Sequence, residues 1–446
     1  MKGKTKLVLP ILVIALLVVS TCECVEQTVK DEKIKEIISY RLTPEQLEKI
    51  ENYEIKVGYI EASSDYEYGL KLGQRYKEVI ESLPNLPGRS ILKSMCLNML
   101  SENHCKYLQE YYPARYERLR GIEDGAGINL KKLISEINST IWSEGEPGCT
   151  TSASAPPATV GNEVFLTWNL DHSYDAKKIF TDIISSPEVD APEVSGLPLF
   201  YVRDIEGYNK VFVFSLGTLG ITEMPLINDK GLAFVANSCK IKDEGPGLPA
   251  LELVNKVMDE CSTVEEAVKI IENSPRFASS KFGSTNINYL FADAQGKIAS
   301  IETSHQYFAV KYGRETGGVL AQANHHQWLD YNKTGAYRPS DYVSSWTRAE
   351  RMWELLRENK GEIDLEKAMS FTADTANGPE PGVGGYASIC RYKERVDPKS
   401  HFDSSRGGTC FAFVIQPREK IVWWCGAHPD EAPYMKIDAG AVFTQD

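Results

Sequence analysis

Hydrophobic and polar positions change their spacing about one third of the way along the chain. Between about residues 30 and 143, apolar residues recur every three or four positions, the spacing of amphipathic helices. The clearest run follows a Ser-Ser-Asp cap at 63–65 and comprises Tyr66, Leu70, Leu72, Tyr76 and Val79. Two more helices are predicted over 91–112 and 130–137, the second behind a glycine turn at 125–127. The first third is therefore predicted to be mainly helical.

Beyond residue 148 the pattern changes to short runs rich in β-branched and aromatic residues. Strands are predicted over 164–166, 211–214, 232–235, 287–291, 298–302, 409–416 and 420–425. Helices are predicted over 250–261, 264–272, 345–357 and 365–371, the last one opened by Asp364. Three residues, 417–419, join the last two strands, which is the length of a hairpin loop. Because strands and helices come in blocks, the pattern favours a layered α+β fold over alternating βαβ units.

The chain begins with the pattern of an export signal. Three lysines within the first six residues precede an apolar run over 7–19, which is short for a membrane span. Ser20, Thr21 and Cys22 follow, so cleavage, lipid attachment at Cys22 and an uncleaved anchor are all open. We expect residues 1–25 to be a signal peptide or a lipid or membrane anchor, and the protein to be exported.

Composition narrows the possible partners and ligands. A hydrophobic content of 42% predicts a substantial core, and a net charge of -13 argues against nucleic-acid binding, which needs a basic surface. An oxidising location would allow disulfides, with Cys96 and Cys105 as the first pair to expect. The cysteine spacings include no CxxC, so no metal site is expected.

Cys149 is the candidate nucleophile. It follows a Gly- and Pro-containing link at 144–148, where a chain is readily cut, and precedes two threonine hydroxyls. A small buried residue at a strand end is the alternative interpretation. If the thiol attacked the carbonyl of Gly148, an N-to-S acyl shift and hydrolysis would leave Cys149 as a new N-terminus. Its α-amine, with a pKa of about 8, would then be a base beside a thiol with a pKa of about 8.5.

Five short motifs follow one another along the chain: Gly148-Cys149-Thr150-Thr151, Trp168-Asn169-Leu170-Asp171, Asn324-His325, Ser345-Trp346-Thr347-Arg348 through Arg351-Met352, and Ser388-Ile389-Cys390-Arg391. In this order they resemble the motifs of the acyl-coenzyme A:6-aminopenicillanic acid acyltransferase family (peptidase family C45). In the first third, Tyr112-Pro113, Glu117 and the segment 120–127 are similar to the propeptide of that family. The resemblance covers nearly everything after the leader.

The resemblance implies an N-terminal nucleophile hydrolase fold, which is a four-layer αββα sandwich, made as a precursor that cleaves itself between Gly148 and Cys149. The expected organisation is a leader over 1–25, a helical propeptide or small chain over 26–148, and the hydrolase domain over 149–446. By position in the motifs, Cys149 would be the nucleophile and Asp171 would orient the new α-amine. Asn324 would supply the side-chain amide of the oxyanion hole, and Arg391 would lie near the nucleophile.

Three further residues are expected to bind substrate. By resemblance, Ser388 and Ser304 match other positions of the active site. Trp168 stands three residues before Asp171, where relatives that act on penicillin V and bile-salt amides carry arginine. An indole cannot replace that cation, so a stacking or apolar surface is expected there.

The predicted function is an exported, self-cleaving cysteine amidohydrolase or acyltransferase that acts on linear amides through a Cys149 thioester and needs no cofactor. Its expected substrate is a small acylated amine or acyl amino acid. The two processed chains are expected to stay associated with each other. An acyl thioester donor remains open. One alternative is a cysteine peptidase pairing Cys149 with His172, His325 or His326, although residues after Cys149 do not favour the helix such a site uses. The other is an exported binding protein whose site has decayed.

Overall fold

The computed structural model describes residues 42–53, 55–77, 102–130, 134, 148–171, 200–215, 223–278, 286–392 and 408–445. The predicted leader, the link at 144–147, Cys96 and His172 lie outside these residues.

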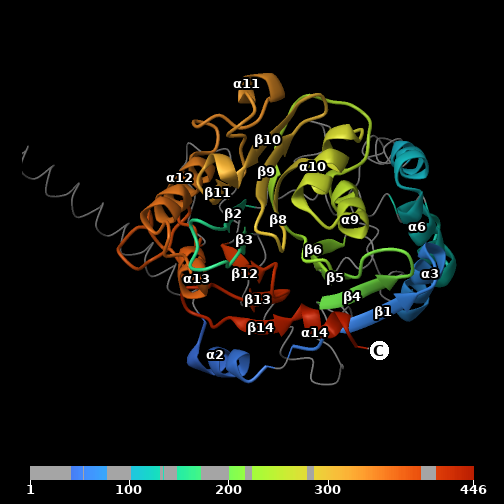
Figure 1. The fold of residues 1–446 in the computed structure, drawn as a ribbon, viewed down its shortest axis with the longest axis horizontal. Helices are drawn as coiled ribbons and strands as arrows, with labels where there is room; N and C mark the ends of the chain where they lie inside the picture. The colour runs from blue at the N-terminus through green and yellow to red at the C-terminus, as the bar shows by residue number, and fades with distance from the viewer. Residues whose placement is uncertain are drawn as a thin grey trace, which may run out of the picture.

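Two β-sheets stacked on each other form the centre of the molecule (Figure 1). The eight-stranded sheet contains, in spatial order, β1 (Gly58–Ala62), β4 (Phe200–Ile205), β5 (Val211–Phe214), β6 (Met224–Asn228), β7 (Ala233–Cys239), β8 (Asn286–Ala292), β9 (Ile298–Thr303) and β10 (Phe308–Tyr312). The six-stranded sheet contains β11 (Val319–Gln322), β2 (Gly148–Ser154), β3 (Phe165–Asp171), β12 (Thr409–Gln416), β13 (Ile421–Cys425) and β14 (Met435–Asp438). Neighbouring strands are antiparallel except β1 and β4.

Side chains along the strands alternate between two hydrophobic layers. In β3, Leu166, Trp168 and Leu170 face the other sheet, while Phe165 faces the helices. Aromatic rings fill the space between the sheets; Phe214 of β5 packs edge-on against Phe413 of β12, with ring centroids 5.0 Å apart. Every residue of β12 is buried, because both faces of its sheet are covered.

Helices cover the outer face of each sheet. On the eight-stranded sheet lie α9 (Ala250–Glu260) and α10 (Val264–Asn273), and on the six-stranded sheet lie α12 (Val343–Glu358) and α13 (Leu365–Thr372). The order helix, sheet, sheet, helix confirms the predicted α+β four-layer sandwich. The described part of the chain also contains α2 (Pro44–Glu51), α3 (Asp65–Arg75), α6 (Pro113–Ala126), α11 (Tyr331–Thr334), α14 (Ala439–Phe443) and the 3-10 turn Gly313–Glu315, and residues 102–111 are helical as well.

The elements predicted after residue 148 are present, most with ends shifted by no more than two residues, but β3 and β7 extend five and four residues beyond the predicted strands 164–166 and 232–235. The predicted strands 211–214 and 409–416 match β5 and β12 at both ends. Asp364 caps α13 as expected, because its side chain accepts the backbone N–H of Lys367 at 2.9 Å. The pattern missed β1, β4, β6, β10, β11 and β14, which are short strands with a weak periodic signal.

The first third of the chain is not purely helical. Ser64 caps α3 as predicted, but β1 precedes it and extends the eight-stranded sheet by pairing parallel with β4. Helices α3 and α6 cross so closely that a Cβ at Gly69 would collide with the carbonyl oxygen of Arg118. Ile50 of α2 reaches the layer between the sheets. The described parts of this region are therefore built into the sandwich, and their role as a propeptide or small chain stays a prediction.

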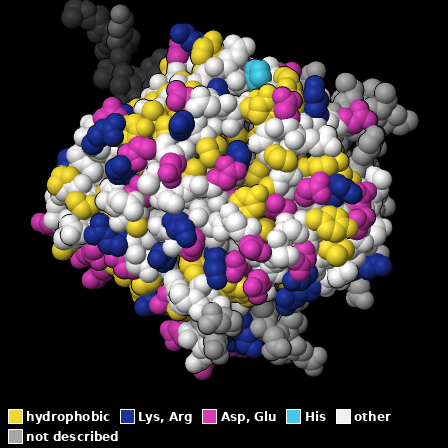
Figure 2. All heavy atoms as spheres, turned by 45° about the vertical axis from the view of Figure 1, so that its right-hand side comes forward, with side chains coloured by type: hydrophobic (Ala, Val, Ile, Leu, Met, Phe, Trp, Pro, Cys, Tyr) yellow, Lys and Arg dark blue, Asp and Glu magenta, His cyan; other side chains and the backbone are white. Residues whose placement is uncertain are grey.

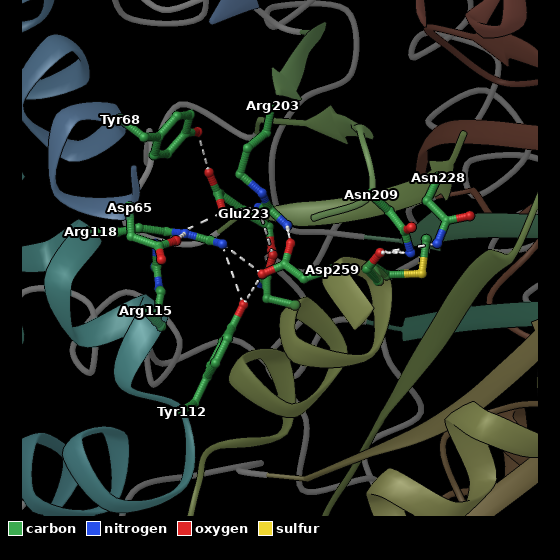
Figure 3. Close-up of polar contacts among 12 residues, drawn as sticks. Asp65, Tyr68, Tyr112, Arg115, Arg118, Arg203, Asn209, Glu223, Asn228 and Asp259 are labelled. Carbon is green, nitrogen blue, oxygen red and sulfur yellow. Dashed lines mark hydrogen bonds and ion pairs between the residues drawn. The ribbon is translucent and has the colours of Figure 1, made fainter. Parts of the chain in front are cut away.

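A buried network of charged side chains joins this region to the sandwich (Figure 3). Arg118 of α6 donates to Asp259 of α9 at 2.7 Å and to Asp65 at 2.8 Å. Arg203 of β4 donates to the other oxygen of Asp259 at 2.6 Å and also bonds to Glu223. Burial raises the pKa of Glu223 and Asp259, but the arginines outweigh burial and hold the pKa of both carboxyls below the usual value.

Further members complete this network. Arg115 of α6 donates to Glu252 of α9 at 2.9 Å, and the hydroxyls of Tyr112 and Tyr68 donate to Asp259 and Glu223. We call the set the clamp network; it comprises Asp65, Tyr68, Tyr112, Arg115, Arg118, Arg203, Glu223, Glu252 and Asp259. A buried charge without a partner of opposite sign is costly. The charged residues of the front region and those of the sandwich therefore depend on each other.

The surface charges, the cysteines and the helix lengths complete the description of the fold. Acidic and basic side chains are interspersed on the face that Figure 2 displays, so neither sign forms a continuous patch there. No disulfide joins two of the seven cysteines within the described ranges, and the predicted pair of Cys96 with Cys105 lies partly outside them and stays a prediction. Among the helices described, none is both long and apolar enough for a membrane crossing.

Candidate active site

Cys149 lies where ends of strands from both sheets meet. It is the second residue of β2 and only 3% exposed. Gly148 pairs with Asp171 at the end of β3, and a Cβ on Gly148 would collide with the guanidinium of Arg391 and lie 2.8 Å from the Asp171 carboxylate. A glycine is required before Cys149 because two charged side chains approach its Cα.

Asn324 follows β11, whose pairing with β2 brings it beside Cys149. The backbone N–H of Cys149 donates to Asn324 Oδ1 at 3.0 Å, and Arg348 Nη2 donates to the same oxygen at 2.8 Å. Both partners can only donate, so the amide oxygen must face them. The amide nitrogen donates to the carbonyl of Ser238, on β7, at 3.0 Å. The Asn324 amide therefore spans the gap between the candidate nucleophile and the other sheet.

Arg348 makes the most contacts in the site, although we did not predict a role for it. It lies on the buried face of α12, four residues after Ser344 and four before Met352. Its Nη1 donates to the carbonyl of Cys149 at 2.5 Å and to Thr150 Oγ1 at 2.6 Å. The arginine thus fixes the backbone on both sides of the Cys149 Cα, through Cys149 itself and through Asn324.

Two serines also escaped prediction. Ser345 Oγ accepts the backbone N–H of Asn324 at 2.8 Å and so fixes the start of that loop. The Ser238 backbone amide lies against the Cys149 thiol and acts to lower the thiol pKa. The motif at 345–348 contained both Arg348 and Ser345 and could have indicated them, whereas no sequence signal marks Ser238.

Asp171 is fully buried and incompletely bonded. Its Oδ1 accepts the hydroxyl of Thr409 at 2.8 Å. Its Oδ2 has no hydrogen-bond donor among the described residues, and the nearest cationic atoms are Arg391 Nη1 at 3.7 Å and Arg348 Nη1 at 3.8 Å. Burial raises the pKa of Asp171, and the two arginines oppose that rise. One buried carboxylate oxygen therefore lies beside Gly148 without a hydrogen-bond donor in the described part of the chain.

Of the two residues predicted in the motif at 388–391, Arg391 lies in the site and Ser388 does not. Arg391 joins the site: its guanidinium lies 4.0 Å from the ring centroid of Tyr386 and contacts Asp171. The Ser388 hydroxyl serves its own loop, since it accepts from Gly385 N at 2.9 Å and donates to Thr375 O at 3.1 Å. Cys149, Asp171, Asn324 and Arg391 thus lie together, while Ser388 only shapes the loop that carries Arg391.

Trp168 and Ser304, the other two predicted substrate contacts, are both buried. Trp168 is 1% exposed and stacks on Phe413 between the sheets, with ring centroids 5.7 Å apart. It packs behind Cys149 rather than lining an open pocket. Ser304 follows β9, where its Oγ accepts from Tyr307 N at 3.0 Å and its carbonyl accepts from Arg276 at 3.0 Å. Within the described residues, no hydrogen bond links Ser304 to the Cys149 cluster.

Burial sets the state of the Cys149 thiol. Burial and the Asp171 carboxylate raise the pKa of Cys149 to about 11, while Trp168, Arg348 and the Ser238 amide oppose the rise. The thiol is therefore protonated at neutral pH in the uncut chain. The arginine that acts to lower the thiol pKa is Arg348.

The two described histidines of the alternative peptidase site do not face the thiol. His325 Nδ1 lies 2.7 Å from Ser345 Oγ and its ring stacks on Trp346, whereas His326 Nδ1 lies 2.9 Å from Thr334 Oγ1. Burial lowers the pKa of His325 to about 3 and that of His326 to about 4. Neither one hydrogen-bonds to Cys149, and His172 lies outside the described residues. With pKa values this low, His325 and His326 are poor general bases near neutral pH.

Two stacked sheets between helical layers form the sandwich of the N-terminal nucleophile hydrolase fold. The chain belongs to the acyl-coenzyme A:6-aminopenicillanic acid acyl-transferase family, whose model matches residues 199–431. It is accordingly an enzyme of the amide-bond hydrolase and acyltransferase type. The matched range contains Asn324, Arg348 and Arg391 but not Cys149 or Asp171, which the geometry alone connects to them.

Solved structures with a similar course of the chain include a penicillin V acylase from Agrobacterium tumefaciens, at 14% identity and a TM-score of 0.36 over 65% of this chain and 86% of that one. A variant of conjugated bile acid hydrolase from Clostridium perfringens has 12% identity and a TM-score of 0.36 over 65% of this chain and 96% of that one. A second variant of the same hydrolase has 10% identity and a TM-score of 0.29 over 66% and 89%. No curated protein matches this chain in sequence.

Proposed function

We propose that the protein cleaves its own Gly148-Cys149 bond and then uses Cys149 to hydrolyse or transfer acyl groups from small acylated amines or acyl amino acids. The observation that carries this proposal is the donor-free Oδ2 of Asp171 beside that bond. A buried carboxylate without a donor is costly, and a new α-ammonium group on Cys149 would supply the missing partner.

Self-cleavage proceeds through the thiol of Cys149. The sulfur attacks the carbonyl carbon of Gly148, the bond from that carbon to Cys149 N breaks, and the nitrogen takes the thiol proton, which gives a thioester and a free amine. Water then hydrolyses the thioester and leaves a carboxylate on Gly148. The amine stays close to Asn324 Oδ1, which already accepts from Cys149 N at 3.0 Å.

Substrate turnover repeats this chemistry between molecules. The α-amine takes the thiol proton, sulfur attacks the substrate carbonyl, and the amine part of the substrate leaves with a proton. A thioester remains, and either water or a second amine resolves it, giving hydrolysis or transfer. The Ser238 backbone amide lies beside the thiol and would donate to the oxyanion. The Asn324 amide nitrogen donates to the carbonyl and the hydroxyl of Ser238 in the uncut chain, and would have to turn from one of them to become the second donor.

The same proposal includes the architecture of the mature enzyme. The clamp network and the strand pairing of β1 with β4 would keep the front segment bound after the cut, as the smaller of two chains. Cys149 is nearly inaccessible in the uncut chain, so removal of Gly148 from the space beside Arg391 is what admits substrate. Export through the N-terminal segment belongs to the proposal as well, supported by the charged and apolar pattern of residues 1–19.

The test is a denaturing gel with N-terminal sequencing of the larger band. The parent is expected to give two fragments, the larger beginning at Cys149, whereas Cys149→Ala should stay uncut. Cys261→Ala is the matched control, because Cys261 is also a buried free cysteine but lies at the end of α9. Cleavage of Cys149→Ala at the parent's rate would show that another protease or another site is responsible.

A further inference from the structure

Three side chains with metal-ligating atoms meet beside the loop that carries Arg391. Cys390 comes from that loop, and His428 and Asp430 come from the loop after β13. One ligand atom of each lies within 4.8 Å of the other two, and Cys390 Sγ lies 3.2 Å from Asp430 Oδ1. We propose that Cys390, His428 and Asp430 bind one divalent metal ion of the zinc type.

The chemistry of the three groups suits this ion. Zinc in proteins is bound by cysteine sulfur, histidine nitrogen and carboxylate oxygen, with bonds of roughly 2.0–2.3 Å. In a tetrahedral site such bonds place the ligand atoms about 3.3–3.8 Å apart. The distance between Cys390 Sγ and Asp430 Oδ1 is already close to this value, and the other pairs need to approach by at most about 1.5 Å. Side-chain rotation is sufficient for that change.

Neighbouring groups hold two of these ligands in place. The hydroxyl of Tyr392 donates to Asp430 Oδ1 at 2.6 Å, which leaves the carboxylate oriented toward Cys390. The Tyr392 ring also stacks on the His428 ring, with centroids 4.0 Å apart and planes 7° apart. Metal ligands typically have such outer partners, which fix the ring plane of a histidine and the orientation of a carboxylate.

The charges of the ligands would balance the charge of the ion, so the ion could be bound in the buried interior. Without a metal, the Cys390 thiol donates to Asp430 Oδ1 at 3.2 Å. On binding, a divalent ion would displace the thiol proton to solvent. One thiolate and one carboxylate then neutralise the two positive charges, so that no net charge is left in the interior.

The position of the ion would give it a role near the active site. Cys390 directly precedes Arg391, and the backbone N–H of Cys390 is bonded to Asp374 O at 2.9 Å. A metal would therefore tie the Arg391 loop to the loop after β13. This is a positioning role, since none of the three ligands contacts Cys149, Asp171 or Asn324 through a hydrogen bond in the described structure.

The test measures metal binding directly. Full-length Cys149→Ala protein, which lacks the nucleophilic thiol, is stripped with a chelator and titrated with Co²⁺, and then Zn²⁺ is added as competitor. We expect one equivalent of Co²⁺ with a thiolate-to-metal charge-transfer band, displaced by one equivalent of Zn²⁺. Adding Cys390→Ser should abolish that band, and adding His428→Gln should weaken binding at least about 10-fold.

Cys425→Ser in the same background is the matched control, since Cys425 is a buried neighbouring thiol that the proposal does not use. It should keep the band and the one-to-one stoichiometry. The proposal fails if the stripped parent gives no thiolate band with Co²⁺, or if Cys390→Ser binds as the parent does. Should Cys390→Ser not fold, the parent titration and the His428→Gln variant still decide the matter.

Discussion

The clamp network and the Cys149 site are both buried clusters of arginines and carboxylates, but they differ in how completely the carboxylates are bonded. In the clamp, both oxygens of Asp259 and both oxygens of Glu223 accept from arginine or tyrosine. In the site, Asp171 Oδ2 has only distant arginines at 3.7 and 3.8 Å. A complete cluster holds two parts of the molecule together, whereas an incomplete one reserves a position for a group that forms later.

The pKa directions follow the same division. Arginines overcome burial and lower the pKa of Asp259, whereas burial prevails and raises the pKa of Asp171. Folding is stabilised by Asp259 above its unfolded pKa, and this contribution is lost as pH falls through its lower folded pKa. Asp171 in the uncut chain acts in the opposite direction, so it opposes folding as the pH rises through its normal range. An α-ammonium group beside it would reverse that sign.

The largest effect is expected from breaking the clamp at one arginine. Arg118→Ala leaves Asp259 and Asp65 without their shared cation, which should cost about 3–5 kcal/mol of the free energy of unfolding. Arg120→Ala is the control in the same helix, because Arg120 is exposed and its pair with Glu117 should contribute less than about 1 kcal/mol. Urea unfolding monitored by circular dichroism measures both. Equal losses in the two variants would mean that the clamp is not a stabilising contact.

Substitutions in the Cys149 site are expected to change the turnover rate more than the stability of the fold. Asn324→Ala in processed enzyme should lower turnover roughly 10²-fold or more while substrate binding changes little, because its donor acts on the oxyanion. Asn324→Asp keeps an acceptor for Cys149 N and Arg348 but loses the amide donor. Steady-state kinetics on both variants separates the two roles. A higher dissociation constant with unchanged turnover would place Asn324 in substrate recognition instead.

Most residues of the site could be predicted from the sequence because they lie in short local motifs. Cys149, Asp171, Asn324 and Arg391 converge, and the strand and helix pattern after residue 148 indicated the layers that bring them together. Arg348 was inside a motif, but only the packing of α12 shows that its side chain reaches Cys149. The clamp could not be predicted, since its partners are far apart in sequence and no period links them. For the same reason, the spacing of cysteines could not indicate Cys390 with His428 and Asp430.

A smaller effect is expected at Glu302, a third buried carboxylate that has donors but no cation. It accepts three successive backbone N–H groups, of residues 327–329, at 2.7 to 2.8 Å, which holds the loop behind Asn324. Burial nevertheless raises the pKa of Glu302 to about 7. The folded chain thus binds an extra proton between the unfolded pKa and about pH 7, and stability should decrease with rising pH in that window by up to about 1.4 kcal/mol per pH unit.

Glu302→Gln should remove this slope, measured as the free energy of unfolding at pH 5, 6 and 7. Glu315→Gln serves as the control, because Glu315 is an exposed partner of Lys311 and should leave the slope unchanged. If Glu302→Gln keeps the parent's slope, another group titrates in this window and Glu302 is ionised throughout.

The most direct test of the account compares amide hydrolysis by cut and uncut protein across pH 5 to 9, together with His172→Ala, His325→Gln and His326→Gln. If the α-amine of Cys149 is the base, uncut protein should hydrolyse no amide, and each histidine variant should keep most of the activity of the processed enzyme. His325→Gln is the variant most exposed to packing losses, because His325 shares Ser345 with Asn324. Activity in uncut protein, or its loss in one histidine variant that still folds and is still cut, would contradict the account and favour a cysteine-histidine pair.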